Sequence, residues 1–185
     1  MKAFATLLKC AVTASCVVFV SAASPAVAAP LDELFAELAQ PDNPEWQRVE
    51  SDILREWSKS GSPAMDLLLK RGEQAIGAGD YEAAIEHLTA LTDHAPDFPE
   101  GWNARATAYF LGGYLGPSLS DIQHTLALEP RHFGALGGLG MILEEMGNEE
   151  AALKAYRAAR AIHPNRPDLK GAVSRLERAL QGTDI

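Results

Sequence analysis

Residues 133–166, with the sequence FGALGGLGMILEEMGNEEAALKAYRAARAIHPNR, indicate the architecture of the chain, because their pattern occurs twice before them. Pro164 lies near the end of this stretch, and Pro130 and Pro96 precede Pro164 at equal intervals, each as long as the stretch itself. The same interval links five sets of small or apolar residues: Leu68, Trp102 and Leu136; Gly72, Ala106 and Gly140; Ala75, Tyr109 and Leu143; Ala84, Ser118 and Ala152; Leu88, Ile122 and Tyr156. A fixed period of this length indicates a protein built from stacked structural units.

This pattern resembles the tetratricopeptide repeat (TPR) family, whose 34-residue unit is a helix–turn–helix. The third copy matches the family best, whereas the second departs from it at Arg105 and Thr125 and the first at Arg71. The resemblance implies an all-α fold, a right-handed solenoid of helical hairpins (the TPR superhelix) with a C-terminal capping helix. The implied units are 63–98, 99–132 and 133–166, followed by the capping helix at 167–181.

Capping residues and helix breakers fall where this register places the ends of helices. Asp80 and Asn148 are good N-caps for the second helix of their units. Glu149 and Glu150 follow Asn148 and favour the positive end of the helix dipole. Pro117 suits the first turn of its helix. The three closing prolines stop each second helix, because proline lacks an amide hydrogen and clashes with the preceding turn.

We interpret the segments on both sides of the repeats as the terminal units of the stack, since repeat arrays need atypical units at their ends. In the predicted capping helix the apolar residues recur at helical spacing: Leu169, Val173, Leu176 and Leu180. At the front, Leu54 and Trp57 lie one repeat period before Leu88 and Leu91. Residues 31–62 therefore have two interpretations, a degenerate extra repeat or two packing helices without repeat ancestry.

The N-terminus has the three-part pattern of a secretory signal peptide. Lys2 and Lys9 are followed by an apolar run over residues 10–23 and then by small residues. We expect cleavage between Ala28 and Ala29, which makes 1–28 the signal peptide and predicts a periplasmic or secreted protein. Two alternatives stay open: residues 10–23 remain as an inner-membrane anchor, or Cys16 is acylated as in a lipoprotein.

Composition excludes several classes of function. The chain has 185 residues, 16 basic and 25 acidic, and a pI near 5.0, which argues against nucleic acid as a partner. Both cysteines lie in the predicted signal peptide, so the mature chain has none. We interpret His94 and His163 as exposed residues at helix ends. The sequence shows no catalytic constellation and no metal or cofactor motif, so we expect neither an enzyme nor a cofactor.

In the TPR family the first helices of the repeats line a concave groove that binds peptides. The positions that usually face it carry Leu69, Glu73, Ile76, Asn103, Thr107, Phe110, Gly134, Gly137, Met141 and Glu144. Family members that grip a C-terminal carboxylate use basic groove residues. The matching positions here carry Leu69, Glu73, Ala104, Gly134 and Gly138, so the basic clamp is absent.

These observations predict a non-catalytic module for protein–protein interaction, an adaptor or assembly factor exported to the periplasm. The expected partner is a protein or peptide segment of basic or neutral apolar character, with no nucleic acid involved. Membrane contact is expected only if the N-terminal segment is retained. The alternative is a structural subunit of a cell-envelope complex, tethered through that uncleaved segment.

Overall fold

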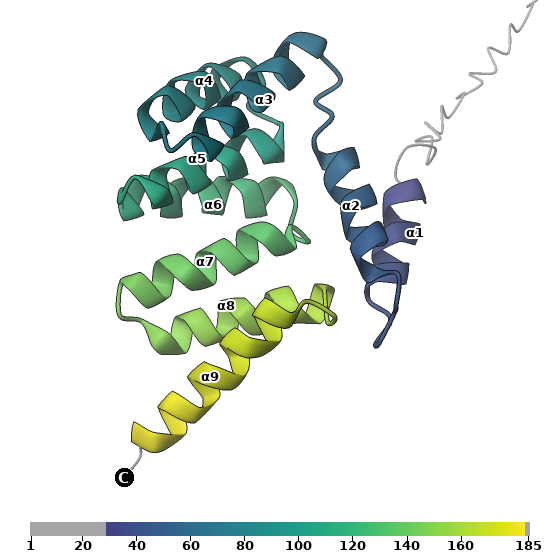
Figure 1. The fold of residues 1–185 in the computed structure, drawn as a ribbon, viewed down its shortest axis with the longest axis vertical. Coiled ribbons are helices and arrows are strands. Elements are labelled where there is room, and N and C mark those ends of the chain that lie inside the picture. Colours follow the sequence, from purple (N-terminus) through teal and green to yellow (C-terminus); the bar gives the residue numbers. More distant parts are fainter. Residues whose placement is uncertain (1–28, 184–185) are drawn as a thin grey trace, which may run out of the picture.

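The computed structural model describes residues 29–183, which form nine helices and no strand. The helices are α1 (Ala29–Leu38), α2 (Trp46–Trp57), α3 (Pro63–Gly77), α4 (Tyr81–His94), α5 (Pro99–Leu111), α6 (Leu115–Leu128), α7 (Phe133–Glu145), α8 (Glu149–Ile162) and α9 (Pro167–Thr183). Helices α3–α4, α5–α6 and α7–α8 are hairpins stacked one on the next, and α9 covers α8 at the C-terminal end (Figure 1). The predicted all-α solenoid with its capping helix is confirmed.

Glycine lets the two helices of a hairpin approach closely in the first and third repeats. A Cβ atom on Gly72 would overlap Cγ of Leu88, and one on Gly140 would lie 2.6 Å from Cε1 of Tyr156. Real Cβ atoms essentially never come that near another side chain, so a residue larger than glycine at either place would force Leu88 or Tyr156 to shift. The second repeat carries Ala106 at the equivalent position.

The helix ends follow the capping residues in the sequence. Asp80 accepts a hydrogen bond from the amide of Ala83 at 3.1 Å, and Asn148 accepts one from Ala151 at 3.1 Å. Both side chains pair an amide that the helix itself leaves without a partner. The two predicted N-caps are thereby confirmed.

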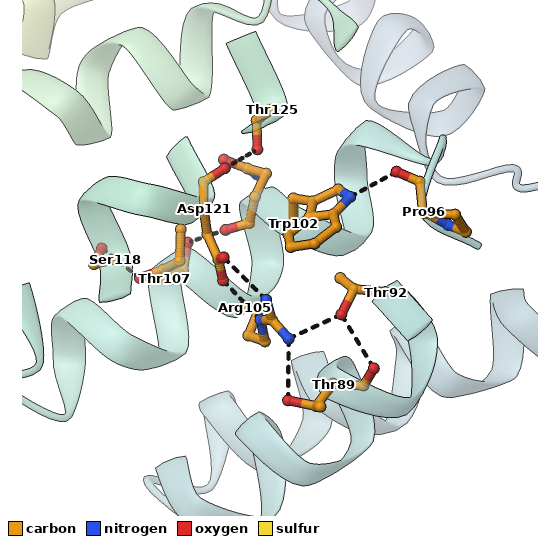
Figure 2. A network of polar contacts seen from close by, with 11 residues as sticks. Thr89, Thr92, Pro96, Trp102, Arg105, Thr107, Ser118, Asp121 and Thr125 are labelled. Carbon is orange, nitrogen blue, oxygen red and sulfur yellow. Dashed lines mark hydrogen bonds and ion pairs between the residues drawn. The ribbon is translucent and has the colours of Figure 1, made fainter. Parts of the chain in front are cut away.

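The second repeat has a polar interior (Figure 2). Nε of Arg105 lies 2.7 Å from Oδ2 of Asp121, and Nη2 donates to Oδ1 at 3.0 Å. Nη1 of the same guanidinium donates to Oγ1 of Thr92 at 2.9 Å and to Oγ1 of Thr89 at 3.2 Å. The guanidinium also lies 4.9 Å from the ring centre of Trp102. One side chain on α5 thus binds α4 and α6 together.

Helices α1 and α2 form the N-terminal hairpin, which lies beside the turns that precede α7 and α9 (Figure 1). Its apolar side packs against Phe133 at the start of α7, and these side chains form one core cluster: Phe35, Leu38, Val49, Ile53, Trp57 and Phe133. Two hydrogen bonds join the hairpin's turn to Asn165, whose Oδ1 accepts from the Asp42 amide at 2.9 Å and whose Nδ2 donates to the Gln40 carbonyl at 2.8 Å. The repeat ancestry of residues 31–62 stays a prediction, whereas their packing on the third repeat is a finding.

The N-terminal hairpin overturns the expectation that His163 is exposed. The His163 side chain has an exposed fraction of 0%, and its ring meets Trp46 and Phe133 edge-on at centre distances of 5.3 and 5.2 Å. The prediction was wrong because a helix end is exposed only when no distant segment covers it, and α2 covers this one. The other histidine of the prediction, His94, is exposed as expected.

No helix within residues 29–183 is long and apolar enough to cross a membrane. The expected signal peptide, 1–28, lies outside the described residues, and so do its alternatives as an anchor or a lipoprotein signal.

Candidate functional site

Helices α5, α7 and α9 line an open pocket, which we call the apolar pocket. Its volume is about 350 Å³. Five of the ten residues expected in the groove line it: Thr107, Phe110, Gly134, Gly137 and Met141. These five come from two neighbouring first helices, so the structure brings together the part of the prediction that spans the second and third repeats.

The glycines of α7 give the apolar pocket its depth. Because Gly134, Gly137 and Gly138 carry no side chain, the pocket reaches past α7 to Ile122 on α6 and Tyr156 on α8. A Cβ on Gly137 would meet only Cδ2 of Leu169, at 3.7 Å, which is an ordinary contact. The space therefore follows from the sequence of α7 and accepts an added methyl group.

Apolar side chains at the rim of the apolar pocket face solvent. Met141 is 48% exposed and Leu111 is 45% exposed. Soluble proteins seldom gather exposed apolar residues around a cavity unless a partner covers them. The apolar pocket is therefore suited to bind an apolar group. The Thr107 side chain adds one hydroxyl to its lining.

Charges at the α9 end of the apolar pocket are already paired. Nε of Arg166 donates to Oδ1 of Asp168 at 3.0 Å, and Nη1 lies 3.4 Å from Oε1 of Glu50 on α2. Burial alone would raise the pKa of Asp168, but the hydrogen bond and charge of Arg166 outweigh it and hold that pKa below its ordinary value. Arg166 is thus not a free cation for an acidic ligand.

Two of the expected groove residues belong to the core of the first repeat instead. Leu69 has an exposed fraction of only 2% and packs with Leu88 and Ala104, which removes it from the groove surface. Ile76 is half-buried against the same cluster. The expectation for Leu69 was wrong because α5 of the next repeat covers that position of α3.

Glu73 and Glu100 form an acidic edge beside Asn103. Glu100 is held by two neighbours: its Oε1 accepts from Nδ2 of Asn103 at 3.0 Å, and its Oε2 lies 2.9 Å from Nε2 of His132. Nδ1 of His132 accepts from the Ala135 amide, so the proton lies on Nε2 and Glu100 accepts it. Loss of solvent around Glu73, and then the nearby Glu100 carboxylate, raise the pKa of Glu73.

Glu144, the last of the expected groove residues, is occupied by internal contacts. Its Oε2 accepts from the Tyr156 hydroxyl at 2.8 Å, and its Oε1 lies 2.6 Å from Nη1 of Arg175 on α9. The hydrogen bond from Arg175 lowers the pKa of Glu144, burial opposes this, and the Tyr156 hydroxyl adds to the lowering. The role of Glu144 here is to join α7, α8 and α9.

Sequence reasoning missed the α9 wall of the site. Leu169 and Ala172 line the apolar pocket, although the α9 segment was interpreted only as a capping helix. The repeat period could have predicted this wall, because Asp168 lies one full period after Gly134, which was expected in the groove. Within residues 29–183, no three His, Cys, Asp or Glu side chains gather as a metal site would require.

Comparisons with known proteins agree with this architecture of helical hairpins around a groove. The family model described as tetratricopeptide repeat matches residues 69–115 and 118–167. A TPR repeat-containing protein of Rhizobium etli is 37% identical over 153 residues, which cover 82% of this chain and 75% of that protein. The chain therefore belongs to the tetratricopeptide repeat family, whose domains are protein-interaction modules and in general non-catalytic scaffolds.

Two similar solved structures contain a bound peptide. The first TPR domain of Spaghetti (RPAP3), bound to the HSP90 peptide SRMEEVD, is 25% identical with a TM-score of 0.62 over 65% of this chain and 95% of that one. The type III secretion chaperone SycD of Yersinia enterocolitica, in complex with a peptide of YopD, has a TM-score of 0.57 at 15% identity, over 65% of this chain and 92% of that one. The second likeness concerns the fold alone.

Proposed function

We propose that this protein is a non-catalytic adaptor or assembly factor that binds a segment of another protein in its groove. The observation that carries the proposal is the apolar pocket, which is open, rimmed by exposed Leu111 and Met141, and deep because of the α7 glycines. The family's role in protein interaction and the peptide bound to the Spaghetti domain support it.

The partner segment is basic or neutral and apolar rather than acidic. The acidic edge at Glu73 and Glu100 repels a carboxylate, and the one basic side chain lining the pocket, Arg166, is paired with Asp168 and Glu50. The acidic HSP90 peptide SRMEEVD bound to the Spaghetti domain is accordingly not the type of ligand proposed for this groove. Nucleic acid is not proposed as a partner, since the chain carries an excess of acidic residues.

A leucine placed in the apolar pocket tests the proposal. Gly137→Leu fills the pocket while raising helix propensity by roughly 0.8 kcal/mol, so the variant is expected to fold. Gly171→Leu is the matched control, because a Cβ at Gly171 meets nothing within 4 Å and the residue does not line the pocket. Crosslinking in intact cells followed by mass spectrometry should recover partners with the wild type and Gly171→Leu but not with Gly137→Leu. Equal recovery by all three would remove the proposal.

Export to the periplasm is the second part of the proposal and rests on the sequence of residues 1–28. Intact-mass measurement of the protein from a periplasmic fraction should give a chain that begins at Ala29. A full-length chain that resists carbonate washing of membranes would favour instead the alternative, a structural subunit of an envelope complex tethered through residues 10–23. An acylated product beginning at Cys16 would identify a lipoprotein.

A further inference from the structure

The charge and polarity of the groove residues differ from one repeat to the next. Because the register recurs once in every helical hairpin, the facing positions of successive first helices form a series. Glu73 on α3 and Glu100 on α5 lie near enough for the Glu100 charge to raise the pKa of Glu73, and Thr107 on α5, Gly134 and Met141 on α7, and Asp168 on α9 line the apolar pocket. Along the groove, the carboxylate pair is therefore followed by the apolar pocket, and the neutralised Asp168 lies at the α9 end of that pocket.

One carboxylate of the pair has a negative charge that no basic side chain of the described residues pairs. Glu100 is engaged by Asn103 and His132, whereas Glu73 has no hydrogen-bond or ion-pair partner within residues 29–183. The basic side chain of the neighbouring α5, Arg105, does not pair with Glu73 because it is bound by Asp121. Arg166, at the α9 end of the apolar pocket, is bound by Asp168 and Glu50. An unpaired carboxylate beside a second one attracts a cation from the partner.

We propose that the groove holds an extended segment with a bulky apolar side chain in the apolar pocket and a Lys or Arg three residues away, beside Glu73. This inference rests on the proposed function and names the chemistry of its partner. The apolar side chain displaces water from the space left by Gly134, Gly137 and Gly138. The cation meets Glu73 on the α3 side, one repeat from the pocket.

The spacing of three residues follows from the distance between repeats. Packed helices lie roughly 8–10 Å apart, which separates the Glu73 position from its counterpart in the next repeat. A polyproline II segment rises about 3.1 Å per residue with three residues per turn, so side chains three apart share a face at about 9 Å. In a β-strand, side chains on one face repeat at about 6.8 Å or 13.6 Å, which fit the repeat less well.

Synthetic peptides test the inference with the purified protein. The reference is the fluorescein-labelled peptide GSPKSPFSPG, whose lysine and phenylalanine are three residues apart and whose prolines favour polyproline II. Anisotropy titrations should show affinity falling about tenfold when the phenylalanine becomes alanine. Affinity should fall about threefold when the lysine becomes glutamate or is moved next to the phenylalanine. The lysine effect should shrink as salt rises.

Protein variants separate the two subsites. Glu73→Gln should weaken only peptides that carry the lysine, and it should leave the melting temperature unchanged or raised, because its surroundings already disfavour the charged carboxyl. Gly137→Leu should weaken every peptide, and Gly171→Leu none. Equal affinity for the lysine and glutamate peptides, no effect of spacing, or no binding of any peptide would overturn the inference. In each of those cases the proposed function still stands if Gly137→Leu abolishes crosslinking in cells, and it fails with the inference if crosslinking is unchanged.

Discussion

The second and third repeats have the same backbone architecture, but the interior of the second is polar and the interior of the third is apolar. Arg105, Asp121 and Thr125 of the second repeat correspond, one period later, to Leu139, Ala155 and Ala159 of the third. The three residues of the second repeat belong to a hydrogen-bond network that joins α4, α5 and α6, whereas the three residues of the third repeat are apolar. In a polar interior, hydrogen bonds between specific donors and acceptors fix the positions of the helices. In an apolar interior rich in glycine, the absent side chains leave space for a pocket.

Breaking the polar interior should give the largest effect. Asp121→Ala leaves the Arg105 guanidinium buried without its carboxylate, and the Arg105 and Asp121 side chains are only 12% and 5% exposed. Unpairing such a charge costs about 3–5 kcal/mol of unfolding free energy. Urea denaturation monitored by circular dichroism measures the loss.

The third repeat supplies the control for that experiment. Arg105→Leu combined with Asp121→Ala installs the residues that occupy the equivalent places in the third repeat, and it should be more stable than Asp121→Ala alone. A double variant as unstable as the single one would mean that the ion pair is not what holds the second repeat together.

Adding one methyl group to the third repeat should have the next largest effect. Gly140→Ala places a Cβ against the Tyr156 ring and should lower the unfolding free energy by about 1–3 kcal/mol. The second repeat tolerates Ala106 there because Ile122 stands where the third repeat has Tyr156. Gly140→Ala with Tyr156→Ile should therefore recover stability, measured by thermal denaturation, and failure of the pair to recover would contradict this account of the packing.

A methyl group three residues earlier should act in the opposite direction. Gly137→Ala meets only an ordinary contact with Leu169 and removes a flexible glycine from the middle of α7. The expected gain in unfolding free energy is about 1 kcal/mol, the helix propensity difference between alanine and glycine. Thermal denaturation of both variants should move the midpoint up for Gly137→Ala and down for Gly140→Ala. Movement in the same direction would contradict the assignment of Gly137 to open space.

The smallest expected effect is the pH dependence that Glu144 gives to the third repeat. Its pKa is lower in the folded chain than the ordinary 4.5, because Arg175 and Tyr156 favour the carboxylate. This contribution to stability is present above pH 4.5 and is lost as the pH falls through the lowered pKa. Glu144→Gln should flatten that part of the pH profile by less than about 1 kcal/mol, and an unchanged profile would contradict it.

The repeat register predicted what depends on local sequence. The N-caps at Asp80 and Asn148 and the tight packing at Gly72 and Gly140 all lie where the repeat period places them. Of the groove residues, Thr107, Phe110, Gly134, Gly137 and Met141 meet at one pocket. These positions are set by neighbouring repeats, which the period describes.

The docking of the N-terminal hairpin was not predictable from the same period. Trp57 lies against His132 with ring centres 4.2 Å apart, and the two residues are far apart in the sequence. Periodicity reports which face of a helix is apolar but not which distant surface covers it. The burial of His163 and the pairing of Glu50 with Arg166 follow from that docking, so both lay beyond sequence reasoning.

The hydrogen bond from the Asp42 amide to Asn165 spans 123 positions of the chain. A linear repeat array makes contacts only between neighbours, so its ends fray independently and its folding is fast. Joining the hairpin to the turn before α9 closes a loop around the three repeats and raises the contact order. The array should therefore fold more slowly than an open array of equal length, and its terminal repeats should exchange their amide hydrogens together rather than one after another.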